Sequence, residues 1–242
     1  FHVSEKGPDY PYARLENASD IYNQLLTLNN GSYEILLMPE YMGHQSWDEE
    51  ISWIKETFGG ADGIPLMLCV YGGGEGGTAT PIPMLTVEQI QEATSAANIK
   101  WLRIAEVPSW HIQENKQFPA DYIQDILKFA NETDLKVFWT EWKNDYPKEN
   151  HETFTLIQAA IKGYENIVTV SFSTNSNELE PADGFLKLED MFTHWGASIQ
   201  AWYWNTTKNS DLMNMPPSLL LAHAVTAKGI GAEILQFEPY WY

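Results

Sequence analysis

Seven short runs of apolar residues recur along the 242-residue chain at intervals of roughly 30 to 35 residues, the length of one strand-and-helix unit. The runs predict β-strands, and most of the stretches between them are long enough for a helix. Repetition of strand and helix is typical of a parallel sheet, because parallel neighbours need a long crossover connection. The predicted strands are residues 33–40, 65–71, 100–106, 136–142, 167–173, 198–204 and 232–238.

The segments between the predicted strands carry helix signals. Ser46 and Thr86 are each followed three residues later by Glu or Gln, which is the capping-box pattern of a helix start. After Pro119, apolar residues recur at three- and four-residue spacing and would share one helix face. We therefore expect helices that bury one side against a sheet.

The strands are apolar at nearly every position, as expected for a sheet that is covered on both faces. Such a sheet could close into a barrel or remain an open, doubly wound layer. The open alternative usually has a glycine-rich phosphate turn after its first strand, and residues 39–43 (Pro-Glu-Tyr-Met-Gly) do not form one. We expect an α/β fold of the (β/α)8 TIM-barrel type.

Residues 1–32 would be a lead-in segment with one helix, and residues 33–242 the catalytic barrel domain. Seven βα units are visible. The eighth strand would come from the N-terminal segment, be hidden in the pattern, or lie beyond residue 242, where a further domain is also an open alternative.

Four of the predicted strands end in a glutamate, and barrel enzymes keep their chemistry at the C-terminal ends of their strands. Glu106 closes an apolar strand, where desolvation raises the pKa of a carboxyl and suits it to act as a general acid. Glu141 ends the next strand and would be its neighbour, while Glu238 would lie opposite Glu106 across an eight-stranded barrel. We predict these three as catalytic residues and Glu40 as a substrate-binding residue.

Aromatic residues gather near the same strand ends, in a chain with ten Trp and twelve Tyr. Alternation along a strand places Trp139 on the same face as Glu141, and Trp202 on the same face as Trp204. An indole ring in such a place could stack on the C–H face of a sugar, although core packing explains many aromatic side chains equally well. The predicted substrate-binding residues are Glu40, Tyr41, Trp110, His111, Trp139, Trp202, Trp204, Asn205 and Tyr240.

The formal net charge of -19 disfavours nucleic acid and anionic membranes as partners, because both would be repelled. It suits a neutral ligand, such as a carbohydrate. The sequence contains no run of about 18 apolar residues, so no membrane span is expected. The acidity and four Asn-x-Ser/Thr sequons favour an extracellular or cell-surface location; the sequons are at Asn17, Asn30, Asn131 and Asn205.

The sequence lacks the motifs of several other classes of enzyme. The glycine-rich run at 71–78 has neither the Gly-Lys-Ser/Thr ending of a phosphate loop nor a dinucleotide fingerprint. The six histidines show no His-Glu-x-x-His spacing, and no Gly-x-Ser-x-Gly elbow is present. The single cysteine, Cys69, lies in an apolar run and would be a small buried side chain. We expect no metal and no cofactor.

The glutamate-ended strands framed by Trp and Tyr, in residues 102–110 and 137–142, resemble those of TIM-barrel glycoside hydrolases. More loosely, they resemble the family-98 type of endo-acting barrel hydrolases. The resemblance implies cleavage of a polysaccharide or glycan by paired carboxylates. The large retaining clan with an Asn-Glu pair after strand 4 is not matched, because Glu106 follows Ala105.

Two other functions remain open at this stage. The chain could be a non-catalytic carbohydrate-binding or cell-surface barrel, or a barrel enzyme of another class, such as a lyase or a sugar-phosphate enzyme. The assignment of acid, base and nucleophile among the three glutamates is open as well.

Overall fold

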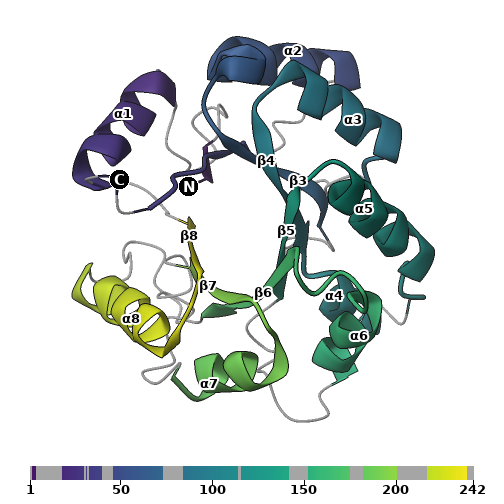
Figure 1. The fold of residues 1–242 in the computed structure, drawn as a ribbon, viewed down its shortest axis with the longest axis vertical. Helices are drawn as coiled ribbons and strands as arrows, with labels where there is room; N and C mark the ends of the chain where they lie inside the picture. Colours follow the sequence, from purple (N-terminus) through teal and green to yellow (C-terminus); the bar gives the residue numbers. More distant parts are fainter. Residues whose placement is uncertain are drawn as a thin grey trace, which may run out of the picture.

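The computed structural model describes residues 2–3, 18–29, 31, 33–39, 46–72, 84–113, 116–141, 152–174, 182–200 and 217–238. The strands form a curled sheet with the helices around its outside (Figure 1). The strands are β1 (His2–Val3), β2 (Met38–Pro39), β3 (Leu66–Gly72), β4 (Ile99–Ala105), β5 (Lys136–Glu141), β6 (Val168–Thr174), β7 (Trp195–Gln200) and β8 (Ile234–Glu238). The helices are α1 (Ala18–Asn29), α2 (Trp47–Phe58), α3 (Val87–Ala96), α4 (Val107–Gln113), α5 (Ala120–Glu132), α6 (Glu152–Ala160), α7 (Ala182–Met191) and α8 (Pro217–Ile230), with a 3-10 turn at η1 (Gly60–Asp62).

The strands follow one another in chain order, and every pairing is parallel. β3 to β8 form one continuous ladder, β1 pairs with β2, and a bridge between Leu37 and Leu66 joins β2 to β3. The predicted α/β barrel topology is thus confirmed, and the strand that the sequence pattern did not locate is β1, from the N-terminal segment. Among the described residues no ladder joins β8 back to β1, so the barrel is open at that seam.

The predicted helix starts are confirmed in their capping contacts. The Ser46 hydroxyl accepts a hydrogen bond from the Glu49 amide at 3.3 Å. Thr86 and Gln89 form a reciprocal capping box, in which each side chain accepts from the backbone N–H of the other residue. Gly59, with a φ of 87°, ends α2 in the left-handed conformation that glycine adopts most readily.

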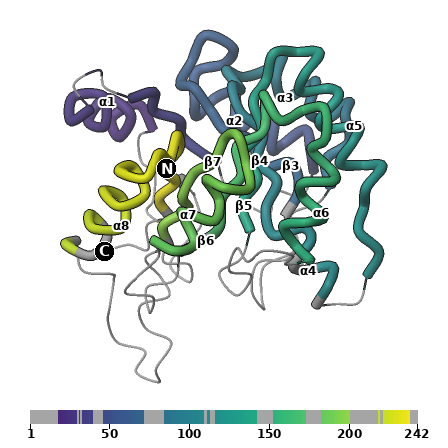
Figure 2. Tube along the Cα trace, turned by 60° about the horizontal axis from the view of Figure 1, so that its bottom comes forward, coloured from purple at the N-terminus to yellow at the C-terminus, as the bar shows by residue number. Residues whose placement is uncertain are grey.

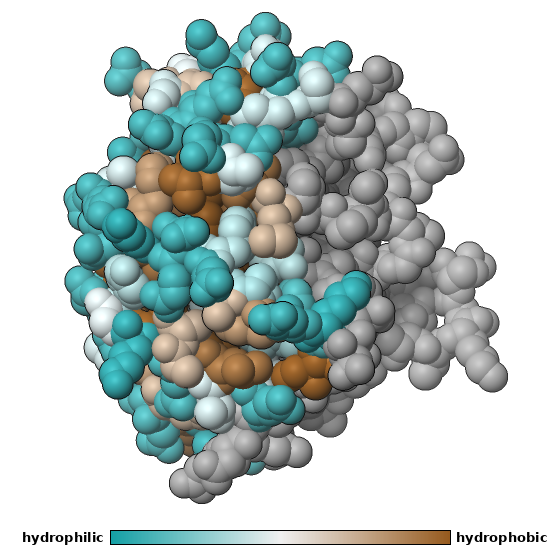
Figure 3. All heavy atoms as spheres, turned by 90° about the vertical axis from the view of Figure 1, so that its right-hand side faces the viewer, coloured by the Kyte–Doolittle hydropathy of each residue, from teal (hydrophilic) through white to brown (hydrophobic). Residues whose placement is uncertain are grey.

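The helices bury one side and expose the other. The apolar face predicted for α5 is fully buried through Ile123, Ile126, Leu127 and Ala130. Figure 2 shows α3, α5 and α6 along one side of the ring and α1 and α8 on the other. Figure 3, which views the right-hand side of Figure 1, shows hydrophilic residues over much of the coloured surface, with apolar groups between them.

The sheet separates two apolar clusters because successive side chains in a strand point to opposite faces. Val137 and Trp139 of β5 belong to the large outer core that the sheet shares with the helices. Phe138, between them, belongs to a small inner cluster with Met38 and Met67. The inner face therefore has its own packing, and this alternation decides which strand-end residues can reach the inside of the barrel.

One predicted strand begins earlier than expected. The strand expected at 198–204 is β7, described from Trp195 to Gln200, with Gly196 paired to Ser171 and Ser198 paired to Gln236; residues 201–204 lie outside the described residues. The inner residues of β7, Gly196 and Ser198, are small and not strongly apolar. The first part of β7 is therefore not recognisable as an apolar run. The β2 strand is also shorter than the expected 33–40, with only Met38–Pro39 in the ladder.

The packing of the inner face can be tested by a substitution at Gly196. A Cβ at this position would lie 2.8 Å from the Ile234 carbonyl oxygen and 3.2 Å from the Phe138 ring. We expect Gly196→Ala to lower the free energy of unfolding by about 1–3 kcal/mol, measured by chemical denaturation, because the inner face is overpacked.

The control for this variant is Gly229→Ala on α8, where a Cβ meets nothing within 4 Å. It should be neutral or stabilising by up to about 1 kcal/mol, because alanine suits a helix better than glycine. Equal stability of Gly196→Ala and the wild type would contradict the inner-face packing.

Candidate active site

Hydrogen bonds at Thr140 of β5 connect it to three other strands, β4, β6 and β8. The Glu106 amide, just after β4, donates to the Thr140 carbonyl oxygen at 2.7 Å. The Thr140 hydroxyl donates to Oε1 of Gln236 in β8 at 3.3 Å and accepts from the Ser171 hydroxyl of β6 at 3.2 Å. Because β5 and β8 are three strands apart in the ladder, the Thr140–Gln236 contact crosses the inside of the barrel.

The inner face near these strand ends is polar. Thr140 is paired with Ser171, and Ser198 with Gln236, and all four side chains are buried. Arg103 lies in register between Cys69 and Phe138 and is buried as well. Buried hydroxyl, amide and guanidinium groups require hydrogen-bonding partners, and Thr140, Ser171 and Gln236 supply them to one another.

Glu106 occupies a strained turn between β4 and α4. Its φ of 55° lies in the left-handed region, which is uncommon for a residue other than glycine. Only 4% of its surface is exposed. Backbone strain of this kind is concentrated at active sites and ligand clamps, where the surrounding fold maintains it. The extended backbone of β4 ends at Ala105, directly before this turn.

Glu141 is held by Trp139. The indole Nε1 donates to Oε1 of Glu141 at 2.9 Å, and neither residue has any exposed surface. The two residues share a face, as the alternation predicts, but it is the outer face, where Trp139 packs in the main core. The substrate-stacking role expected for Trp139 is therefore corrected: its ring offers no surface to a sugar and serves the core instead.

His111 connects α4 to β3 through hydrogen bonds of both ring nitrogens. Its Nδ1 lies 2.6 Å from the Val107 carbonyl oxygen and its Nε2 lies 3.3 Å from the Tyr71 hydroxyl. A carbonyl oxygen only accepts, so Nδ1 donates to Val107, while Nε2 shares the second hydrogen bond with the Tyr71 hydroxyl. Both ring nitrogens of His111, a predicted substrate-binding residue, are thus engaged within the protein.

Tyr71 reaches His111 because β3 is irregular at its end. The register shifts between Cys69 and Tyr71, and Tyr71 pairs with Ile104, whose side chain belongs to the outer core. The irregularity moves Tyr71 from the inner to the outer face. Burial raises the pKa of its phenol above the ordinary value, so the hydroxyl keeps its proton at neutral pH.

The remaining predicted residues lie at the edge of what the structure describes. Glu238 is the last residue of β8 and pairs with Gln200, and Trp110 lies within α4. Six others lie outside the described residues: Glu40, Tyr41, Trp202, Trp204, Asn205 and Tyr240.

The sequence reasoning did not single out Thr140, Ser171 or Gln236. All three are polar residues that alternate with apolar ones in otherwise buried strands. That pattern is the available signal, because a polar side chain in a strand covered on both faces must have a partner inside the protein.

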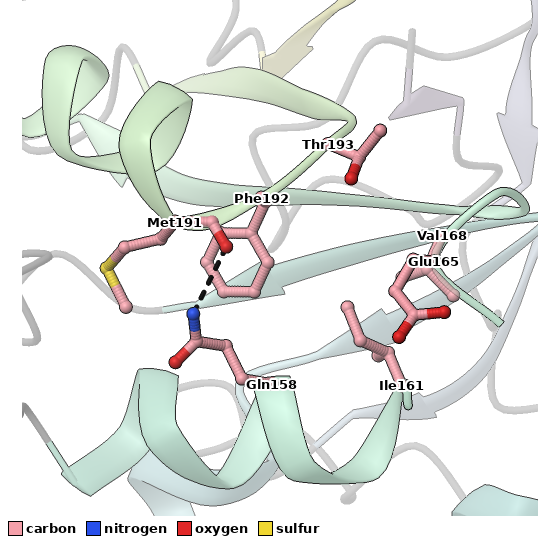
Figure 4. Close-up of a pocket in the computed structure, with 7 residues that line it drawn as sticks. All are labelled: Gln158, Ile161, Glu165, Val168, Met191, Phe192 and Thr193. Carbon is pink, nitrogen blue, oxygen red and sulfur yellow. Dashed lines mark hydrogen bonds between the residues drawn. The ribbon is translucent and has the colours of Figure 1, made fainter. Parts of the chain in front are cut away.

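A pocket at the other end of the strands is not part of this site. It has a volume of about 160 Å³ and lies where α6 and α7 end and β6 begins. Figure 4 shows Gln158 of α6 reaching across it to the Met191 carbonyl oxygen, at 3.1 Å. It opens at the N-terminal ends of the strands, the end that supports stability in barrel enzymes.

In the described part of the chain, no group of three or more His, Cys, Asp or Glu side chains is placed to hold a metal ion. No helix there has the length and apolar character needed to cross a membrane.

No protein-family model and no curated protein matches the chain. Solved structures do match it in fold. The catalytic module of a family 98 glycoside hydrolase from Streptococcus pneumoniae has a TM-score of 0.60 at 12% identity, covering 98% of this chain and 45% of that one. The chain therefore spans less than half the length of that hydrolase.

Two other solved structures have different activities. A type I 3-dehydroquinate dehydratase from Clostridium difficile has a TM-score of 0.53 at 12% identity, covering 99% of this chain and 85% of that one. An aldolase has a TM-score of 0.51 at 10% identity, covering 98% and 89%. The class that fold and comparisons define is thus the TIM-barrel type, whose members here are enzymes of several reaction classes.

The contribution of the Thr140 hydroxyl, which connects β5 to β6 and β8, can be tested by substitution. Thr140→Val keeps the shape of the side chain but removes the hydroxyl that bonds Gln236 and Ser171. We expect it to lower the free energy of unfolding by about 1–3 kcal/mol in chemical denaturation, because buried polar groups lose their partner.

Thr153→Val on α6 is the matched control. The Thr153 hydroxyl is equally buried but has no hydrogen-bond partner among the described residues, so its removal should change stability by no more than about 0.5 kcal/mol or be stabilising. Equal effects of the two variants would contradict the role given to Thr140.

Proposed function

We propose that this protein is a glycoside hydrolase that cleaves a polysaccharide or glycan, with Glu106 as the proton donor. The observation that carries the proposal is the meeting of β4, β5 and β8 at Thr140. It brings two glutamate-ended strands to either side of a polar barrel interior. Two carboxyls that flank a glycosidic bond are the minimal apparatus for its hydrolysis.

Glu238 is a better candidate than Glu141 for the second catalytic carboxylate. In the chain order of eight strands, β4 and β8 are four apart, which places them on opposite sides of a barrel. Gln236 reaches Thr140 inside the barrel, and from strand alternation we expect Glu238, two residues later, to share that face. Glu141, the alternative, is fully buried and bonded to Trp139.

The proposed reaction follows from these two positions. Glu106 donates its proton to the oxygen of the leaving sugar, and Glu238 either activates a water or forms a glycosyl-enzyme intermediate. The separation of the two carboxyls decides between these routes. The net charge of -19 favours an uncharged glycan over a sulfated or uronic one, because a polyanion would be repelled.

The aldolase and dehydratase neighbours raise the alternative of Schiff-base chemistry, which needs a lysine at the reacting end of the barrel. Among the described residues, no lysine lies at the C-terminal end of a strand; Lys100 and Lys136 lie where β4 and β5 begin. Lys143, the one lysine that the sequence places at a predicted strand end, lies outside the described residues, so the preference for acid catalysis rests on the glutamate-ended strands.

Glu106→Gln tests the proposal on a panel of glycans with different linkages. Loss of the proton donor should reduce hydrolysis about 10²–10⁴-fold, while glycan binding measured by calorimetry persists because the side chain keeps its shape. Glu165→Gln, an exposed glutamate beyond the far end of the barrel, is the control and should retain full activity.

Two results would overturn the proposal. A wild-type protein that binds glycans but cleaves none would be a non-catalytic carbohydrate-binding barrel. Full activity in Glu106→Gln would remove Glu106 as the proton donor.

A further inference from the structure

We propose that Tyr71 and His111 are positioning residues, because their hydrogen bond holds the first turn of α4 and thereby keeps Glu106 in its left-handed backbone conformation. The consequence for catalysis rests on the proposed function, in which Glu106 donates the proton. The effect on the backbone does not depend on that reaction and can be tested without substrate. His111 then acts inside the protein, in place of the substrate contact predicted from the sequence.

The backbone of Glu106 needs support from its surroundings. Among the described residues, Glu106 and Asp134 are the non-glycine residues with a φ in the left-handed region, at 55° and 57°. Aspartate tolerates this region better than most residues, and Asp134 lies in an exposed turn after α5. Glu106 lacks that tolerance and is buried. Such strain persists only where the surrounding structure over-determines it, so contacts on both sides of Glu106 must maintain the turn.

The ladder fixes the chain before the turn, and α4 continues it afterwards. Ala105 pairs with Thr140, and the Glu106 amide donates to the Thr140 carbonyl oxygen at 2.7 Å. The next residue, Val107, begins α4, and its side chain is buried in the outer core. Seven residues are too few for a helix to be stable on its own, so α4 depends on other elements. Its contacts include packing on β5 and α6 and the hydrogen bond to β3.

Two hydrogen bonds lead from β3 to the residue after Glu106. The Tyr71 hydroxyl lies 3.3 Å from Nε2 of His111, and Nδ1 of His111 donates to the Val107 carbonyl oxygen at 2.6 Å. The imidazole also packs edge-on against Phe118, with ring centroids 6.5 Å apart, and His111 is buried. Hydrogen bonds are directional and apolar packing is not, so this path fixes the orientation of the short helix where packing alone would not.

The strain at position 106 can be measured as the difference in stability between Glu106→Gly and Glu106→Ala. Both variants remove the side chain with all its contacts, and glycine alone adopts the left-handed region without a steric penalty. In the otherwise wild-type chain, Glu106→Gly should therefore unfold at a higher denaturant concentration than Glu106→Ala. In the Tyr71→Phe background the turn can relax, so the two unfolding midpoints should move closer together.

The chain offers two matched controls. Asp134 lies at the opposite end of the strands, so the difference between Asp134→Gly and Asp134→Ala should be the same in both backgrounds. Tyr122 packs edge-on against Tyr71, but its hydroxyl donates to the carbonyl oxygens of Val70 and Leu85 and not to α4. Tyr122→Phe therefore removes a phenol hydroxyl from the same cluster and should leave the difference at position 106 unchanged.

Three outcomes would overturn the proposal. Equal midpoints for Glu106→Gly and Glu106→Ala in the otherwise wild-type chain would show that the turn stores no strain. An unchanged difference in Tyr71→Phe would show that the hydrogen bond does not maintain it. An equal reduction in Tyr122→Phe would show that the turn responds to any loosening of β3. His111→Phe, which keeps a ring but has no ring nitrogen, should reproduce the effect of Tyr71→Phe and replaces it if that variant does not fold.

Catalysis gives a second readout if the wild type cleaves a glycan. Tyr71→Phe should lower kcat about 10- to 100-fold on that glycan and leave KM within a few-fold, because a displaced acid impairs proton transfer more than binding. An unchanged kcat would overturn the positioning role. If the wild type cleaves no glycan, the proposed function fails, and the unfolding midpoints alone decide whether the hydrogen bond holds the turn.

Discussion

The hydrogen bonds of Thr140 connect the strand ends on which the site depends. Its hydroxyl bonds Gln236 across the inside of the barrel and Ser171 on the neighbouring strand, and its carbonyl oxygen holds the Glu106 amide. These contacts make position 140 an inner position. Because side chains alternate along a strand, Trp139 and Glu141 on either side of Thr140 must then face outward. β5 therefore contributes Thr140 to the polar interior and its two neighbours to the outer core.

The sequence predicted the architecture well because each βα unit is locally consistent. Apolar strands, helix caps at Ser46 and Thr86 and a one-sided α5 all agree with the parallel sheet. It failed where tertiary contacts override local pattern. The start of β7 contains small inner residues such as Gly196, so it has no apolar run that would predict a strand. At the end of β3, a register shift moves Tyr71 to the outer face, which the sequence pattern does not indicate. Alternation correctly paired Trp139 with Glu141, but it cannot say which face is inside.

The same logic divides the predicted catalytic glutamates. Glu106 lies in a strained turn just after β4, Glu141 is bonded to an indole in the outer layer, and Glu238 ends a strand whose Gln236 faces inward. The solved structures with this fold carry out different reactions, so the fold alone does not choose among them. The proposal of a glycosidase rests instead on two glutamate-ended strands, β4 and β8, that lie four apart in the chain order of the barrel.

The central proposal is that Glu106 and Glu238, from β4 and β8, are the two carboxyls that flank the scissile bond at the C-terminal end of the barrel. A crystal structure of the full chain would measure the distance between their carboxyl groups directly. The account predicts a separation between about 5 and 9.5 Å, the range spanned by retaining and inverting glycosidases. Carboxyls well beyond that range, or a Glu106 side chain directed into the apolar core, would contradict it.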